Sequence, residues 1–342
     1  MDHVAIDLGS KESQICVRAS DGRLLEEGRR PTLGLGKYLS GRPASRVVLE
    51  TCAEAFSVAE AARAAGHEVR IVPASLVRAL GVGARGLKTD ERDARALSQM
   101  SCRMEDLPSV HLPSKESRER KALCGMKEAL TEARTKLVNS VRGWMRSQGL
   151  GGPRGGALVT FNRRIRERLK VKEVVAPSYV ERQLAAIEQL SIQIVAGTKE
   201  LEALAKADPT CRRLMTAPGV GPATSIRFLA AVDDVSRFPN ARVLESYLGL
   251  VPGENSSSER RRLTSITKAG ATKVRWVLVQ AAWAAWRHRK LDPLVVWAQR
   301  VGERHGRRIA IVALSRRLAG VLYALLRDGS TYDAHHLARI SS

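Results

Sequence analysis

Short alternating runs of apolar and polar residues fill the first hundred positions of the chain. Apolar runs and strict alternation predict strands, and the Asp21-Gly22 pair predicts a hairpin turn between two of them. An Ala-rich segment that stops at Gly66 predicts a helix, as does the segment after a cluster of glycines at 81–86. Strands are predicted at residues 4–8, 13–19, 23–30, 46–50 and 68–72, and helices at 53–65, 73–80 and 88–102.

This order of elements predicts one α/β sheet of mixed direction. Three strands form a meander, and a strand–helix–strand–helix segment follows them. Ribonuclease-H-like folds have this order. Their first and fourth strands are neighbours, and the helix after the fifth strand packs over the same end of the sheet. We therefore expect a ribonuclease-H-like N-terminal domain.

Helical patterns dominate the rest of the chain. Residues 115–148 form a long, charged helical stretch, and GLGGPRGG at 149–156 breaks it. Apolar residues then recur at near-heptad spacing over 180–206, which predicts a helical arm or short coiled coil. The predicted parts are an α/β domain with its trailing helix at 1–150, a linker and arm at 151–206, and a mainly helical domain at 207–342. The near-heptad positions are Leu184, Ile187, Leu190, Ile194 and Leu201.

A Pro-Gly-Val-Gly turn separates two short helical segments at 214–231. Gly219 and Gly221 let the backbone approach another surface closely, and the N-terminus of the second helix can present N–H groups to a phosphate. This pattern predicts a helix-hairpin-helix that contacts the nucleic-acid backbone. The alternative is a plain packing joint between two helices.

The charge balance indicates a polyanionic partner. The 342 residues hold 57 Lys and Arg against 35 Asp and Glu, a formal net charge of +22. Nucleic acid would relieve the self-repulsion of this charge and release counterions on binding. Arg316 and Arg317 interrupt the longest apolar stretch, so we expect no membrane span. Five dispersed cysteines suit reduced thiols, so we expect a cytoplasmic protein.

Four carboxylates occupy notable positions in the predicted sheet. Asp7 lies on the first strand, Glu50 ends the fourth, and Asp90 and Asp93 share one side of the helix that follows the fifth. The predicted fold would bring them together, where bare carboxylates repel and divalent cations remove the repulsion. We therefore expect Mg²⁺, as two ions per site, assisting phosphoryl transfer. The alternatives are a turn cap for Asp7, a helix N-cap for Asp90 and an exposed first-turn charge for Asp93.

The AIDLGS start also resembles the first phosphate loop of actin-like ATPases and sugar kinases. Those chains carry a second phosphate loop in a duplicated domain. We find no second Asp-x-Gly loop on a strand, and the basic charge balance does not suit a small-molecule kinase. This alternative is therefore the weaker one.

Basic residues gather around a serine-rich loop in the second half. Three serines, 256–258, precede an arginine run, and nearby cations could activate a serine hydroxyl and neutralise the phosphate it attacks. From the residues alone, a flexible phosphate-contacting loop fits this pattern better than a nucleophile. The predicted nucleic-acid contacts are Arg260, Arg261, Arg262, Lys268, Lys273 and Arg275, with a second basic cluster of Arg163, Arg164 and Arg166.

The chain resembles the DEDD-type insertion-sequence transposases, the group that includes the Piv DNA invertase and the bridge-RNA-guided recombinases. The resemblance rests on AIDLGSK, VVLET and KTDERDARAL in the first half, and on PGVGPATS, FPNARVLESYLGLVP and ENSSSERRRLTSITKAG in the second. It implies a RuvC-like first domain and a helical transposase domain. Residue by residue, the family's metal-binding acids match Asp7, Glu50, Asp90 and Asp93.

The resemblance also implies a serine nucleophile. The family's serine lies five residues after the Pro of an LVP-type turn, and counting from Pro252 gives Ser257. The next position is Ser258 in place of the usual Gly, so Ser256 and Ser258 stay open as alternatives. The implied mechanism is attack on a DNA phosphate, a covalent phosphoserine, strand exchange and religation with Mg²⁺ assistance.

The implied partners are donor and target DNA, a structured bridge RNA, and further copies of the chain in a homodimer that assembles into a homotetramer. Three other interpretations stay open. One is a Holliday-junction-type nuclease that uses water, the second is a DNA invertase, and the third is a non-enzymatic nucleic-acid-binding protein.

Overall fold

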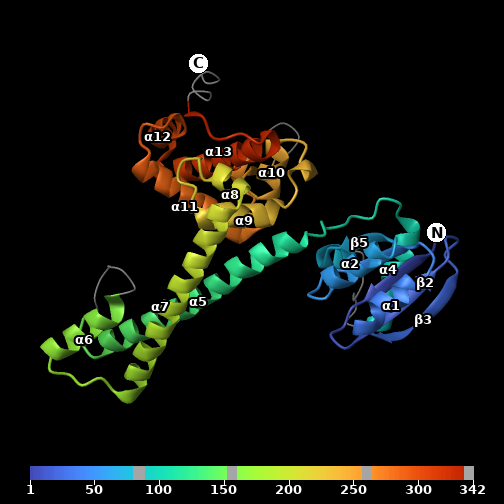
Figure 1. Ribbon diagram of the computed structural model, residues 1–342, viewed down its shortest axis with the longest axis horizontal. Helices are drawn as coiled ribbons and strands as arrows, with labels where there is room; N and C mark the ends of the chain where they lie inside the picture. Colours follow the sequence, from blue (N-terminus) through green and yellow to red (C-terminus); the bar gives the residue numbers. More distant parts are fainter. Residues whose placement is uncertain (80–88, 152–159, 256–262, 335–342) are drawn as a thin grey trace. The chain divides into compact units, whose positions relative to one another are not determined.

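The computed structural model describes residues 1–79, 89–151, 160–255 and 263–334 (Figure 1). The chain divides into two compact units, Met1–Pro113 and Ser114–Ser342, and each is described by itself. The long helical stretch from residue 115 is predicted as part of the first domain, which is expected at 1–150. In the structure this stretch packs within the second unit instead.

A five-stranded sheet of mixed direction forms the centre of the first unit. The strand order is β3-β2-β1-β4-β5; β1 pairs antiparallel with β2 and parallel with β4, and β4 pairs parallel with β5. The predicted meander and the predicted neighbourhood of the first and fourth strands are therefore confirmed. The strands are β1 His3–Asp7, β2 Glu12–Arg18, β3 Leu24–Pro31, β4 Arg46–Glu50 and β5 Glu68–Val72.

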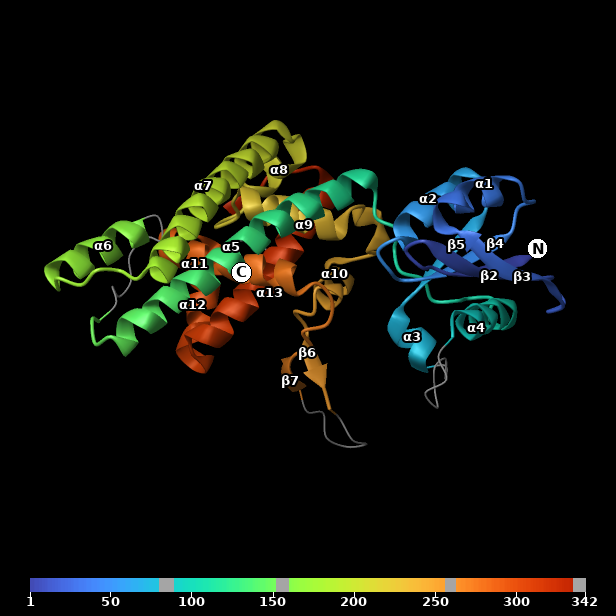
Figure 2. The same ribbon diagram turned by 90° about the horizontal axis from the view of Figure 1, so that it is seen from below.

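Helices cover both faces of this sheet, and Figure 2 shows α1 and α2 on one face and α3 and α4 on the other. One core lies between the sheet and the pair α1 and α2, and a smaller core lies between the sheet and α4. Burial on both faces explains why β1 and β4 read as continuous apolar runs. The helices are α1 Leu35–Ser40, α2 Ala55–Ala64, α3 Ala74–Ala79 and α4 Asp90–Arg103, with a 3-10 turn η1 Thr32–Gly34 before α1.

Two long helices cross and pack against each other in the second unit. These are α5 (Lys115–Ser147) and α7 (Ser178–Ala207), and the short α6 (Phe161–Val171) lies between them in sequence (Figure 1). The far end of the pair has a core of its own, to which all three helices contribute. Four of the five near-heptad positions of α7 are buried, so the helical prediction for this segment is confirmed.

The remaining helices surround the largest core of the protein. A short antiparallel pair, β6 and β7, flanks the polar loop that the sequence predicts near residues 253–265. The elements are α8 Pro209–Leu214, α9 Pro222–Val232, η3 Val235–Arg237, α10 Ala241–Tyr247, β6 Pro252–Glu254, β7 Leu263–Ile266, α11 Thr272–His288, α12 Pro293–His305 and α13 Arg307–Asp328.

Helix α13 is long and apolar enough to cross a membrane, as judged by length and composition. Its surroundings are those of a core helix, because it packs against α10, α11 and α12 and buries Leu314, Leu318 and Leu322 completely. Arg316 within it donates to the mostly buried Glu245 at 2.5 Å. Within the described residues, the helix therefore serves the core of the second unit.

Gly219 fixes the turn between α8 and α9 by close packing. Its φ is +75°, and a Cβ atom would lie 2.1 Å from the carbonyl oxygen of Ala281 on α11. We expect Gly219→Ala to destabilise the second unit by about 2 kcal/mol or more, because the left-handed backbone and the clash both oppose a side chain. Urea unfolding followed by circular dichroism measures the change.

Gly125→Ala is the matched control. Gly125 lies within α5, where an added Cβ meets nothing within 4 Å. Alanine there should raise the free energy of unfolding by about 0.5–1 kcal/mol. Equal effects of the two substitutions would contradict the packing role of Gly219.

Candidate functional site

Strand alternation places Asp7 and Glu50 on one face and at one end of the sheet. Ala5 of β1 and Val48 of β4 belong to the core on the α4 side. Side chains two residues apart share a face, so Asp7 and Glu50 also project to the α4 side. Because β1 and β4 are parallel and each ends at its acid, both carboxylates reach the same edge.

Helix α4 brings the other two acids to this edge. Near its end, Ser101 lies 2.7 Å from the His3 ring at the start of β1. The start of α4 therefore lies toward the opposite end of β1, where the acids are. Asp93 is 2% exposed there, whereas Asp90 lies on the surface with its nearest oxygen 4.0 Å from the guanidinium of Arg29 on β3.

The donor set at this edge suits a hard divalent cation. Three carboxylates, those of Asp7, Glu50 and Asp93, share the face, and carboxylate oxygens are the ligands that Mg²⁺ prefers. Among the residues that the structure describes, no three Asp, Glu, His or Cys side chains lie close enough to hold one metal ion. The fold thus gathers the acids without bringing them to ligand distance, and it turns Asp90 toward Arg29.

The predicted nucleophile, Ser257, lies outside the described residues. So do the alternatives Ser256 and Ser258 and the arginines Arg260, Arg261 and Arg262. The two short strands β6 and β7 approach this segment from either side. The structure therefore describes the base of the serine loop, and the assignment of the serine stays a prediction.

Two glycines and a buried arginine hold the base of the serine loop. Gly249 has a φ of +68°, and a Cβ there would lie 2.2 Å from the Ala269 oxygen. Gly270 is also left-handed, with a φ of +69°. Arg275 is 8% exposed and donates to the carbonyl oxygens of Leu248, at 3.1 Å, and of Ala269. This framework is not predicted from the sequence, although isolated glycines on both sides of a polar loop are a visible signal of it.

The lysines near the loop are on the surface. Lys268 is exposed, with a left-handed backbone and its N–H donating to the Gly249 oxygen at 3.1 Å. Lys273 pairs with Glu132 of α5 at 2.6 Å, and this hydrogen bond raises the pKa of Lys273. Contact of Lys268, Lys273 and Arg275 with nucleic acid stays a prediction, and Arg275 also has the structural role given above.

The two glycines of the predicted helix-hairpin-helix differ in their surroundings. Gly219 faces α11 within the protein, as its clash with Ala281 shows. Gly221 is the N-cap of α9 and has no atom within 4 Å of a Cβ position. The turn between α8 and α9 is therefore tight, and of the two glycines Gly221 has the open surface.

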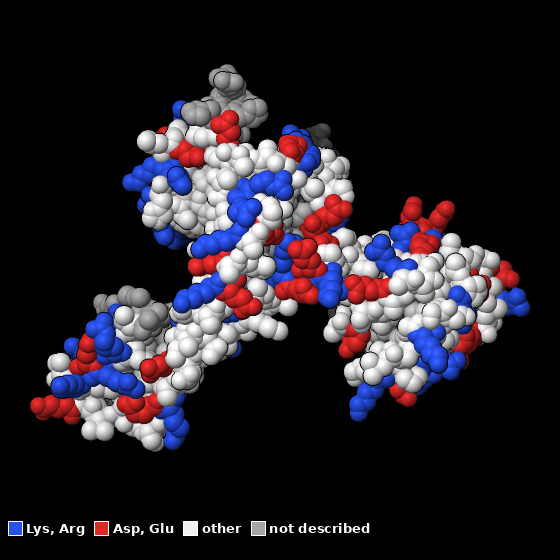
Figure 3. All heavy atoms as spheres, viewed as in Figure 1, with Lys and Arg blue, Asp and Glu red and all other residues white. Residues whose placement is uncertain are grey.

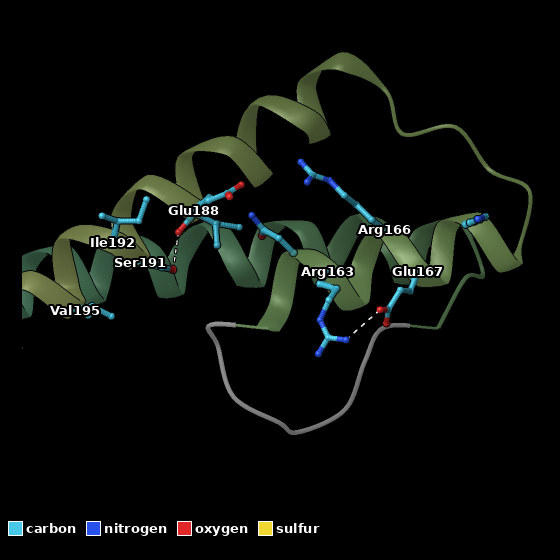
Figure 4. Close-up of a pocket in the computed structure, with 10 residues that line it drawn as sticks. Arg163, Arg166, Glu167, Glu188, Ser191, Ile192 and Val195 are labelled. Carbon is cyan, nitrogen blue, oxygen red and sulfur yellow. Dashed lines mark hydrogen bonds and ion pairs between the residues drawn. The ribbon is translucent and has the colours of Figure 1, made fainter.

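The basic cluster of α6 lines a groove against α7. Arg163 and Arg166 belong to its wall, and the groove has a volume of about 720 Å³ (Figure 4). Arg163 pairs with Glu167 at 3.3 Å and Arg166 with Glu181 at 3.5 Å. Figure 3 shows basic and acidic side chains interleaved in this region of the second unit, and Arg164 is only partly exposed.

Models of transposase families match both halves of the chain. Residues 4–148 match the model of the DEDD transposases of the IS110 group, and residues 211–294 match the model of the IS116/IS110/IS902 transposase family. The first match contains all four predicted acids, and the second contains the serine loop.

Individual relatives extend over nearly the whole chain. A probable family 20 transposase of Pseudomonas aeruginosa is 30% identical over 300 residues, which are 85% of this chain and 86% of the relative. The transposase of the element IS1111A from Coxiella burnetii is 28% identical, with 96% of this chain and 90% of the relative covered. That of IS1328 from Yersinia enterocolitica is 26% identical over 96% and 98%.

The buried bonds of Arg275 predict a stability effect. Arg275→Met keeps the length of the side chain but leaves two carbonyl groups without their donor, so we expect a loss of about 1–3 kcal/mol in the free energy of unfolding. Lys273→Met is the control, because an exposed ion pair contributes about 1 kcal/mol or less. Urea unfolding compares them, and an Arg275→Met protein as stable as the control would refute the structural role.

Proposed function

The chain belongs to the DEDD-type insertion-sequence transposase family, and on this premise we propose that it cuts and rejoins donor and target DNA through a phosphoserine intermediate. The observation that carries the proposal is the division of the predicted site. The acids lie in the part matched by the DEDD model, and the serine loop lies in the part matched by the second transposase model. We propose that both parts take part in the DNA strand chemistry.

The acidic edge of the sheet is the proposed metal site. Asp7, Glu50 and Asp93 would hold divalent ions, which we take to be Mg²⁺, and Asp90 would join them by leaving Arg29. When bound, such ions neutralise the carboxylates and stabilise charge on the phosphate oxygens. The position of Asp93 supports this role, because it is buried at the same edge of the sheet as Asp7 and Glu50.

Ser257 is the proposed nucleophile. Its oxygen forms a bond to the phosphorus as the bond from phosphorus to one deoxyribose oxygen breaks, and that oxygen leaves as a hydroxyl with a proton. In rejoining, a hydroxyl of another strand attacks the phosphoserine and releases the serine. The base formed by Gly249, Gly270 and Arg275 suits a reacting loop, because it fixes the described residues on both sides of the serine segment.

Other parts of the chain take supporting roles in the proposal. The helix-hairpin-helix formed by α8 and α9 would contact the DNA backbone through the N-terminus of α9 at Gly221. Arg163, Arg164 and Arg166 of α6, with the loop cations, would contact phosphates. The pair of α5 and α7 would join copies of the chain into dimers and tetramers, and a bridge RNA would select the DNA sites.

The decisive experiment detects the covalent intermediate. The protein is mixed with Mg²⁺, with RNA transcribed from the flanks of its own gene, and with matching donor and target DNA, and a denaturing gel separates DNA from protein–DNA adducts. We expect adduct with the natural chain. Ser257→Ala and Asp7→Asn should each reduce it by at least about a thousandfold, because each removes a member of the reacting site.

Asp21→Asn is the control, since Asp21 lies exposed in the turn between β2 and β3. It should leave the adduct unchanged. If Ser257→Ala still cleaves DNA without forming adduct, and Asp7→Asn does not cleave it, then water is the nucleophile. That outcome would favour the nuclease interpretation. Adduct that persists in Ser257→Ala would move the nucleophile to Ser256 or Ser258.

A further inference from the structure

One row of residues crosses the sheet at its acidic edge. Asp7 of β1 pairs with Gln14 of β2, and Gln14 pairs with Arg29 of β3. Paired residues of neighbouring antiparallel strands have their side chains on the same face. Glu50 ends the next strand on the other side of β1. The row therefore runs from carboxylates through a neutral amide to a guanidinium.

Gln14 lies on the α4 face of the sheet, the same face as Asp7. Two residues further along β2, Cys16 lies 3.1 Å from Ser98 of α4, which fixes the face of the alternating positions. Arg29 shows the same orientation independently, because it reaches Asp90 at the start of α4. The amide of Gln14 thus stands between the acids and Arg29.

Gln14 can donate to a group bound at this edge. The residue is 7% exposed, and within the described part of the chain its side chain makes no hydrogen bond. Its amide atoms are not among the buried polar atoms that lack a partner, so the amide keeps contact with solvent. An amide that reaches solvent beside the carboxylates is available to a ligand there.

We propose that Gln14 donates its amide N–H to a non-bridging oxygen of the DNA phosphate at the acidic site, and that Arg29 binds the next phosphate of the same strand. The proposal rests on the proposed function and names how that site holds its substrate. A neutral donor suits this position. A carboxylate would add to the repulsion among the acids, and a cation would compete with the metal ions for them.

Arg29 is placed to exchange partners. Its side chain is 66% exposed, and its nearest approach to Asp90 is 4.0 Å. Exposed pairs of this kind contribute little stability, so a phosphate can displace the carboxylate at small cost. Adjacent strands lie about 4.8 Å apart, so the backbones of Asp7 and Arg29 lie roughly 10 Å apart. Displacement would also release Asp90 toward the other acids.

The test measures DNA binding separately from cleavage. The full chain, with RNA from the flanks of its gene, is titrated onto a fluorescent duplex that spans one end of its own element. Ca²⁺ replaces Mg²⁺ to suppress cleavage, and anisotropy gives the affinity. We expect Gln14→Leu to weaken binding about tenfold to a hundredfold, the range for one hydrogen bond to a charged group. Gln14→Glu, which keeps the size of the side chain, should weaken it further by repulsion.

A modified substrate separates contact from structure. A methylphosphonate at the cleaved position removes one phosphate oxygen, in each of two stereoisomers. With one isomer, the natural chain should lose as much affinity as Gln14→Leu loses on the unmodified duplex. Gln14→Leu should lose no further affinity when it is given that isomer. If the affinity losses from the methylphosphonate and from Gln14→Leu add independently for both isomers, the proposal is wrong. It is also wrong if Gln14→Glu binds the duplex as tightly as the natural chain. Thermal unfolding confirms that each variant is folded.

Arg29→Gln tests the second contact. A plot of the logarithm of the affinity against the logarithm of the salt concentration has a slope that reflects the number of phosphate contacts. Arg29→Gln should make this slope shallower by about the amount of one contact. Arg23→Gln is the matched control, because Arg23 is equally exposed and pairs with Asp21 in the turn between β2 and β3. Equal salt slopes for the two variants would refute the role of Arg29. A natural chain that binds this duplex but forms no adduct with Mg²⁺ would refute the phosphoserine while leaving the phosphate row standing.

Discussion

The parallel pairing of β1 with β4 is the constraint on which the acidic edge depends. Two strands that run in one direction end at the same edge of a sheet, so the last residue of each becomes a neighbour of the other. If β4 ran the other way, Glu50 would lie at the far edge from Asp7. The buried Asp93 of α4 adds a third carboxylate to the same face. Fold direction alone thus concentrates negative charge at one end of the sheet.

Much of the first unit follows from the sequence because its signals are local. Alternation and glycine turns predict all five strands to within two residues, and the order of the elements predicts which strands are neighbours. The short helix α1 is not predicted, because glycines interrupt its pattern. The ion pair of Asp90 with Arg29 is not predicted either, since it depends on how β3 and the start of α4 meet.

The second unit is predictable in its helices and less so in its joints. Helical periodicity identifies α7, whereas the packing of α5 against α7 and α9 depends on contacts between distant segments. Gly219 is an example of a joint whose packing partner is visible only in the structure. Its sequence pattern suggests approach to a phosphate, but the close neighbour in the structure is α11. Arg275 likewise looks like one more basic residue of the loop, and only the fold shows that it binds carbonyl groups of its own chain.

The acids of this edge lie far apart along the chain, and this separation matters while the chain is being translated. Asp7 and Glu50 meet only after the crossover between β1 and β4 exists, and Asp93 joins them only when α4 packs on the sheet. Such non-local contacts form late in folding. A chain emerging from the ribosome therefore carries no assembled site until about the first hundred residues have left the tunnel.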